Sequence, residues 1–248
     1  PSFCNRGVWP AGYRANMPRI TLTLALLLVA SLRADPPRKM TLAFSEDFDG
    51  TELDKTKWVV ATQLPAVNVK VQGGKLQLGI CQDSAAKWVG SSVSTRGRFE
   101  QARGYFEASI RFGKFQGHHG AFRLINEKIN PSEKYGEIYV AEGFGGDVVI
   151  NWMRYNDGVA LREDKPKNLK PLPVGQAGGQ FNTYGVEWAP REVTWFINGK
   201  KTHTVRFEMP QEKLLLVLGT TVSEYERPKL DPAKLPDDVE IDWVKAWR

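Results

Sequence analysis

The stretch from Val193 to Val205 reads VTWFINGKKTHTV. Two runs with many β-branched and aromatic residues flank Asn198-Gly199, a residue pair that strongly favours a two-residue turn between antiparallel strands. This stretch therefore predicts a β-hairpin.

Other segments show the same preference for strands: 74–80, 104–112, 214–218 and 239–247. Helical periodicity is nearly absent, and residues 161–180, which are rich in Pro, Gly and Lys, predict a surface loop. Many short strands without alternating helices are typical of an antiparallel sandwich or barrel. We therefore expect an all-β protein with a single β-sandwich domain over residues 35–248.

Residues 1–34 differ in composition from the rest of the chain. Met17-Pro18-Arg19 precedes an apolar run from Ile20 to Leu32, and Ala34 offers a small residue for cleavage. A charged start, a short apolar middle and a small residue at the end are typical of a secretory signal peptide. We interpret 1–34 as upstream residues followed by such a signal. We expect a secreted or periplasmic protein that leaves the membrane once the signal is removed.

The charge of the chain excludes some function classes. The net charge is +6, with 34 basic and 28 acidic residues, but residues 1–34 contain four of the arginines and no acidic residue. The remaining near-neutral chain has no basic stripe, which argues against a nucleic-acid partner. Two cysteines and three scattered histidines predict no zinc site. We expect a monomer whose chemistry requires no cofactor.

A pair of glutamates lies in the segment YGEIYVAEG (135–143). Glu137 and Glu142 are five positions apart, which places them on opposite faces of a regular strand. One extra residue, a β-bulge near Val140-Ala141, would return Glu142 to the face of Glu137 and Tyr139. The carboxyls could then approach the ~5–5.5 Å separation that a retaining glycosidase needs. From the pattern alone, a solvated strand face is the alternative.

From about Phe44 to its C-terminus, the chain resembles glycoside hydrolase family 16, the group of laminarinases, lichenases and agarases. The resemblance rests on six pieces in order: FSEDFDGTELDKTKW (44–58), GKLQL (74–78), SSVST (91–95), GRFEQARGYFEA (97–108), FNTYGVEW with WFING (181–188 and 195–199), and IDWVK (241–245). It implies a jelly-roll sandwich of two curved antiparallel sheets, with the substrate cleft across the concave face.

The resemblance also implies roles for the glutamate pair. The catalytic pattern of the family is E-x-D-x-x-E, and this chain has E-I-Y-V-A-E at 137–142. Glu137 is then the nucleophile and Glu142 the general acid/base. Tyr139 stands in the catalytic position of the aspartate that orients the nucleophile. A phenol can donate a hydrogen bond there, but it supplies no negative charge.

The predicted cleft departs from the family in a second place. Many relatives have a G-x-W-P-A-F-W-like stretch where this chain has GHHGAFR (117–123), so His119 and Arg123 replace two stacking tryptophans. These side chains favour an anionic sugar, sulfated or uronic, because they form charge-assisted hydrogen bonds. A solvated Arg123 at the rim is the alternative. The resemblance implies further substrate contacts at Trp88, Phe122, Asn151 and Met153.

These features predict a retaining endo-glycosidase, or a related transglycosylase, that acts by double displacement on a β-linked polysaccharide, either neutral or anionic. The alternative is a non-catalytic carbohydrate-binding protein on the same fold, and Tyr139 is the residue that raises it. Asp242 matches the C-terminal aspartate of the family. This match implies a structural calcium completed by backbone carbonyls, since calcium prefers oxygen ligands.

Overall fold

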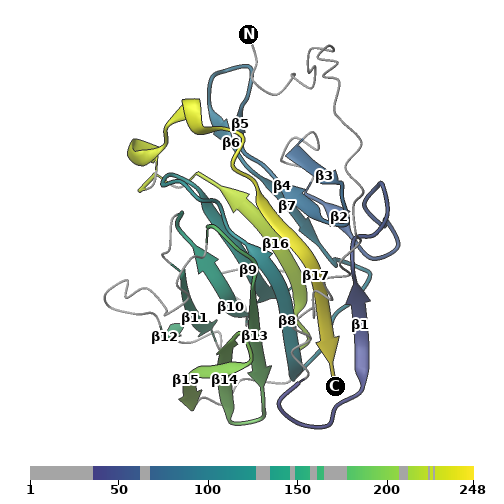
Figure 1. The fold of residues 1–248 in the computed structure, drawn as a ribbon. Coiled ribbons are helices and arrows are strands. Elements are labelled where there is room, and N and C mark those ends of the chain that lie inside the picture. Colours follow the sequence, from purple (N-terminus) through teal and green to yellow (C-terminus); the bar gives the residue numbers. More distant parts are fainter. Residues whose placement is uncertain are drawn as a thin grey trace, which may run out of the picture.

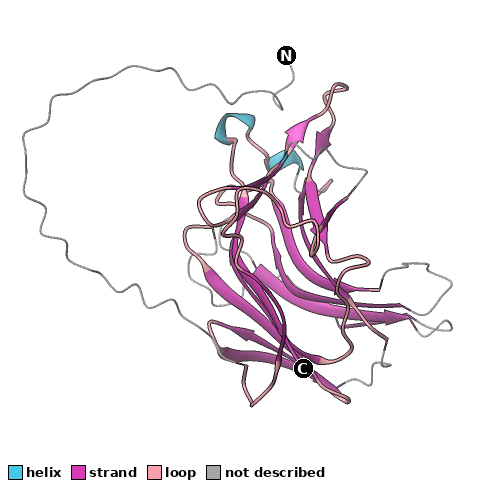
Figure 2. Cartoon of the chain, turned by 90° about the vertical axis from the view of Figure 1, so that its right-hand side faces the viewer, coloured by secondary structure: helices cyan, strands magenta, loops and turns pink. Residues whose placement is uncertain are grey.

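Antiparallel strand pairs form most of the part of the chain that the structure describes. The computed structural model describes residues 36–61, 68–126, 135–145, 149–156, 161–164, 178–206, 212–222, 224–225 and 227–248. The predicted leader at 1–34 lies outside these residues. Figure 2 shows the strands in curved layers, with helix confined to two short 3₁₀ turns in the described residues, η2 (Arg227–Lys229) and η3 (Pro232–Lys234).

One sheet has eight strands among the described residues. Its order is β15 (Lys200–Arg206), β14 (Glu192–Ile197), β13 (Asn182–Trp188), β8 (Gly104–Arg111), β17 (Val239–Trp247), β4 (Leu76–Leu78) and β3 (Val69–Val71), and β1 (Leu42–Glu46) also pairs with β17. Figure 1 shows β1 and β17 side by side, although they lie near opposite ends of the chain. We call it the first sheet.

A seven-stranded sheet forms the second layer within the described ranges. Its order is β12 (Leu161–Asp164), β11 (Val149–Asn156), β10 (Tyr135–Gly143), β9 (His119–Ile125), β16 (Leu215–Thr221), β7 (Ser91–Ser94) and β2 (Val59–Val60). We call it the second sheet. A separate two-stranded sheet joins β5 (Cys81–Gln82) to β6 (Trp88–Val89). The all-β sandwich expected from the sequence is confirmed.

The predicted hairpin forms as β14 and β15, with φ of 49° at Asn198 and 71° at Gly199. Both residues of the turn thus have the positive φ that a tight hairpin turn requires, which Asn and Gly tolerate best. One prediction about a loop is wrong. Residues 161–164, expected in a loop, form edge strand β12 against β11.

The core lies between the two sheets. Both sheets contribute to it, with Phe106, Ile110, Val186 and Trp188 from the first and Phe122, Leu124, Ile138, Val140 and Leu216 from the second. Because side chains alternate along a strand, the residues between these apolar positions face away from the core. On the second sheet that opposite side, which we call the outer face, carries the charged and aromatic residues described next.

Candidate active site

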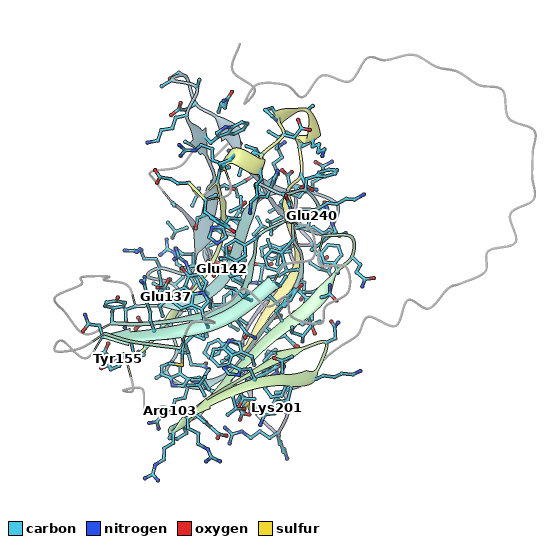
Figure 3. The ribbon with its side chains drawn as sticks, turned by 90° about the vertical axis from the view of Figure 1, so that its left-hand side faces the viewer. Arg103, Glu137, Glu142, Tyr155, Lys201 and Glu240 are labelled. Atoms are coloured by element: carbon cyan, nitrogen blue, oxygen red, sulfur yellow. The ribbon has the colours of Figure 1, made fainter. Side chains whose placement is uncertain are left out.

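Strand β10 contains the predicted β-bulge. Against β11, Tyr139 pairs with Trp152 but Glu142 pairs with Ile150. Between these two pairs, β10 therefore contains one more residue than β11. The register against β9 shifts between Tyr139 and Ala141 in the same way. The bulge therefore returns Glu142 to the outer face, as expected, while Ile138 packs in the core. Figure 3 shows Glu137 and Glu142 close together on one layer, with Lys201 on the other.

A hydrogen bond from the first sheet stabilises this bulge. The indole Nε1–H of Trp195 donates to the backbone carbonyl of Tyr139 at 2.9 Å, and this contact is buried. A bulge interrupts the ladder of backbone hydrogen bonds, and a buried carbonyl left without a donor is costly. Trp195 therefore satisfies a group at the bulge and packs in the core at the same time.

Two arginines from the neighbouring strands hold Glu137. Arg123 on β9 donates from Nη1 to Oε1 at 2.9 Å. Arg154 on β11, directly opposite Glu137 in register, contacts Oε2 from both Nε and Nη2 at 2.6 Å. The Glu137 side chain is 1% exposed, whereas the Arg123 and Arg154 side chains are 32% and 29% exposed. The carboxylate of Glu137 therefore lies beneath two cations.

The charges of this cluster reinforce one another. Burial is the largest single influence on the pKa of Arg154 and lowers it, but the charge and hydrogen bond of Glu137, together with Tyr135 and Tyr139, raise the pKa overall. The Arg154 guanidinium also lies over the rings of Tyr135 and Trp152, at 5.5 and 5.7 Å from their centroids. We call Glu137, Arg123 and Arg154 the arginine clamp.

Glu142 has a different environment. His119 Nε2 lies 2.7 Å from Oε1, and Trp152 Nε1 donates to Oε2 at 2.6 Å. The His119 ring stacks on Phe144 with centroids 4.9 Å apart and an angle of 5° between the planes, which fixes the orientation of the imidazole. Two ring nitrogens, rather than guanidinium groups, therefore contact this buried carboxyl.

Tyr139 joins the two environments. Its ring stacks on Trp152 at 4.2 Å, and its hydroxyl accepts a hydrogen bond from Arg123 at 3.3 Å. Burial, reinforced by the negative charge of Glu137, raises the pKa of the Tyr139 hydroxyl to about 12. The residue between the glutamates is therefore a neutral phenol that fills space, contacts Arg123 and adds no charge near neutral pH.

Several of the predicted substrate contacts are wrong. Phe122 and Met153 are 0% and 2% exposed and belong to the core between the sheets. Asn151 is also buried, and alternation along β11 directs it to the same core side as Met153. These three side chains do not line the outer face. Trp88 is half-buried on the small β5–β6 sheet, apart from the strand that carries the glutamates.

The sequence reasoning missed Arg154 and Trp152. Both contact the glutamates directly, and both lie on β11, opposite β10. Alternation offered a signal, because Trp152 and Arg154 must face the side opposite to Met153. His119 and Arg123 were predicted as substrate contacts; the structure places each of them on a glutamate instead.

Asp242 is half-buried on β17 at a register shift between Ile241 and Trp243. Burial raises its pKa, and the nearby carboxylates of Asp47 and Asp49 raise it further. Among the described residues, no group of three or more His, Cys, Asp or Glu side chains is arranged to hold a metal ion. A cation here would thus need backbone oxygens beside Asp242. Within the same residues, no helix is long and apolar enough to cross a membrane.

Comparison with known proteins places this geometry in a family. Residues 55–245 match the model of glycosyl hydrolases family 16. The β-glucanase of Rhodothermus marinus is 22% identical, over 94% of this chain and 95% of its own length. The β-glucanase of Brevibacillus brevis is 25% identical, over 75% of this chain and 74% of its own.

Two solved structures share the fold. The laminarinase catalytic domain of Thermotoga maritima superposes with a TM-score of 0.70 at 20% identity, covering 85% of this chain and 99% of that one. The kappa-carrageenase of Zobellia galactanivorans superposes with a TM-score of 0.70 at 18% identity, covering 87% and 97%. With the family match extending over most of the chain, this protein belongs to family 16 of the glycosyl hydrolases, and is a glycoside hydrolase.

Proposed function

We propose that the protein is a retaining endo-glycosidase that cleaves a β-linked polysaccharide, with Glu137 as nucleophile and Glu142 as general acid/base. The observation that carries this proposal is the bulge in β10, which brings two buried glutamates to one face of the sheet. Two carboxylic acids on one face are the working groups of retaining enzymes, whose nucleophile and acid/base lie ~5–5.5 Å apart.

In the proposed reaction, an oxygen of Glu137 bonds to the anomeric carbon as the glycosidic C–O bond breaks. The leaving oxygen takes the electron pair of that bond and the proton of Glu142. Glu142 then removes a proton from water, the water oxygen attacks the anomeric carbon, and the ester to Glu137 breaks. The anomeric configuration is retained after two inversions.

Tyr139 occupies the position of the aspartate in the E-x-D-x-x-E pattern of relatives. Because its hydroxyl contacts Arg123, which also contacts Glu137, we propose that Tyr139 orients the nucleophile through this arginine. The β-glucanases among the relatives make a β-glucan the first neutral polymer to test. Arg123 and Arg154 beside Glu137 make an anionic polymer the first charged polymer to test.

The test is the release of reducing ends from laminarin, lichenan, agar, carrageenan and porphyran. We expect hydrolysis of at least one polymer, with the newly formed end in the β configuration in the first product seen by NMR. Glu137→Gln should lower turnover by several orders of magnitude, because it removes the nucleophile. The matched control is Glu192→Gln, an exposed glutamate on the first sheet, which should keep the rate.

Two results would contradict the proposal. An active wild type that keeps its rate after Glu137→Gln uses another nucleophile. A protein that binds one of the polymers but cleaves none, in the wild type or after Tyr139→Asp, is a carbohydrate-binding protein on a glycosidase fold.

We also propose that the protein acts outside the cytoplasm after removal of a signal within residues 1–34, since polysaccharides are met there. A structural calcium at Asp242 is a further proposal. The carboxylate of Asp242, completed by backbone carbonyls beside it, would supply the oxygen ligands that a hard cation prefers. The calcium has no role in the cleavage steps above.

A further inference from the structure

The arginine clamp carries more positive than negative charge. Arg123 and Arg154 supply two cations, Glu137 supplies one anion, and the Tyr139 hydroxyl beside them is neutral near pH 7. In the resting protein the excess is one positive charge, because two guanidinium groups share one carboxylate. The side chains of both arginines are nevertheless about a third exposed, while Glu137 is 1% exposed. The surface presented to a substrate is therefore guanidinium.

The proposed reaction removes the only anion of the clamp. When an oxygen of Glu137 bonds to the anomeric carbon, the carboxylate becomes a neutral ester. The transition state that leads to it has positive charge on the sugar, so three positive centres would meet with reduced compensation. Separating a buried ion from its partner is costly. A nucleophile held by two arginines is thus poorly matched to a neutral sugar.

We infer that the substrate carries an oxyanion, a sulfate or carboxylate substituent, that binds Arg123 and Arg154 and replaces the charge lost from Glu137. The inference rests on the proposed function. A guanidinium has five N–H donors, and the contacts with Glu137 and Tyr139 use Nη1 of Arg123 and Nε and Nη2 of Arg154. The outward N–H groups suit an oxyanion, which guanidinium binds in a bidentate manner.

The same contact would uncover the nucleophile. Three guanidinium contacts at 2.6–2.9 Å occupy both oxygens of Glu137. A carboxylate has about four lone-pair sites, so little remains for attack on carbon. An oxyanion that draws the guanidinium groups toward itself weakens these contacts as the substrate arrives. Arg123 and Arg154 then determine specificity, and a neutral polymer of the same backbone reacts more slowly.

The test uses Glu137→Gln, which carries no charge at this position, as in the glycosyl-enzyme. Calorimetry measures its binding to oligosaccharides of a sulfated β-linked galactan and to the same oligosaccharides after desulfation. We expect Glu137→Gln to bind the sulfated form at least about tenfold more tightly than Glu142→Gln does, since a hydrogen bond between charged groups is worth about that factor. The desulfated form should bind both variants alike.

Further variants separate the clamp from general charge. Arg154→Gln or Arg123→Gln, added to Glu137→Gln, should abolish the preference, whereas Arg191→Gln, at an exposed turn before β14, should keep it. Thermal melting confirms that each variant is folded. Arg123→Gln in the otherwise unchanged protein gives the same readout if a double variant does not fold, since it should lower the sulfated-to-desulfated ratio of affinities.

A second pair of ligands separates the two oxyanions: a β-linked uronate oligosaccharide and its carboxyl-reduced form. If Glu137→Gln prefers the sulfated member of its pair, the substituent on the substrate is a sulfate; if it prefers the uronate member, the substituent is a carboxylate. Equal binding of charged and uncharged members in both pairs overturns the inference, and leaves the proposed function standing if the wild type releases reducing ends. Conversely, a wild type without activity whose Glu137→Gln variant still prefers the oxyanion sinks the proposed hydrolysis but keeps the binding site.

Discussion

The two ends of strand β10 hold their glutamates in opposite ways. Glu137 lies between two guanidinium groups that are charged at every relevant pH, whereas Glu142 contacts one imidazole and one indole. A carboxylate in direct contact with two guanidinium groups is part of a network of ion pairs within the fold. A carboxyl that contacts one imidazole and one indole has no guanidinium partner, so its environment depends more on hydrogen bonds. We therefore expect the first environment to affect the stability of the fold and the second to affect the proposed proton transfer by Glu142.

The largest expected effect on stability is at the clamp. Arg154→Gln should lower the free energy of unfolding by about 2 kcal/mol, because it leaves a buried carboxylate with only one cation. Glu137→Gln should also destabilise, but the double variant should cost less than the sum of the two single changes. Urea unfolding measures all three. If the loss of unfolding free energy in the double variant equals the sum of the two single losses, the charges of the clamp are not coupled. Glu137 would then not differ from Glu142 in being part of a charge network.

A medium effect is expected at the other end of the strand. His119→Leu removes a contact to Glu142 but no permanent charge, so turnover should fall by about tenfold with little change in unfolding free energy. His119→Gln, whose amide can donate a hydrogen bond, should recover part of the rate. Comparison of kcat and KM on the polymer that the wild type cleaves checks this. A loss confined to KM would mean that His119 binds sugar and does not position Glu142.

The smallest effect is expected far from β10, at Asp242. Its raised pKa means that its charged form is disfavoured in the folded protein. Any stability it contributes is present below the ordinary aspartate pKa of 3.8 and is lost as pH rises through the raised value. In calcium-free buffer, Asp242→Asn should thus raise Tm slightly at pH 7 and not at pH 3.

Added calcium should raise Tm in the wild type but not in Asp242→Asn, because bound ligand stabilises the folded state. The same increase in both proteins, or none in the wild type, counts against a calcium site. Neither Asp242→Asn nor added calcium should change the effects expected for the variants beside Glu137 and Glu142.

Local sequence predicted much of the fold because strands and turns have local causes. Asn198-Gly199 turns at positive φ as expected, and Trp58, Trp188 and Trp195 are buried in the core. Trp243, by contrast, is half-buried, with Lys245 Nζ 4.8 Å from its ring centroid. The pattern of a strand shows which residues share a face, but it does not show which face is covered.

The glutamate pair shows which features of the site could be predicted from the sequence and which could not. The odd spacing of Glu137 and Glu142 showed that a bulge is needed to bring them to one face, because alternation is a property of a single strand, and the family resemblance gave the reason to expect it. The partners of the glutamates could not be predicted, because they depend on the register between strands. Arg154 reaches Glu137 only because β11 pairs with β10 at that position, and Trp195 reaches the bulge only because the two sheets pack together. The sequence by itself determined the two carboxyls; only the tertiary structure placed one of them between two arginines.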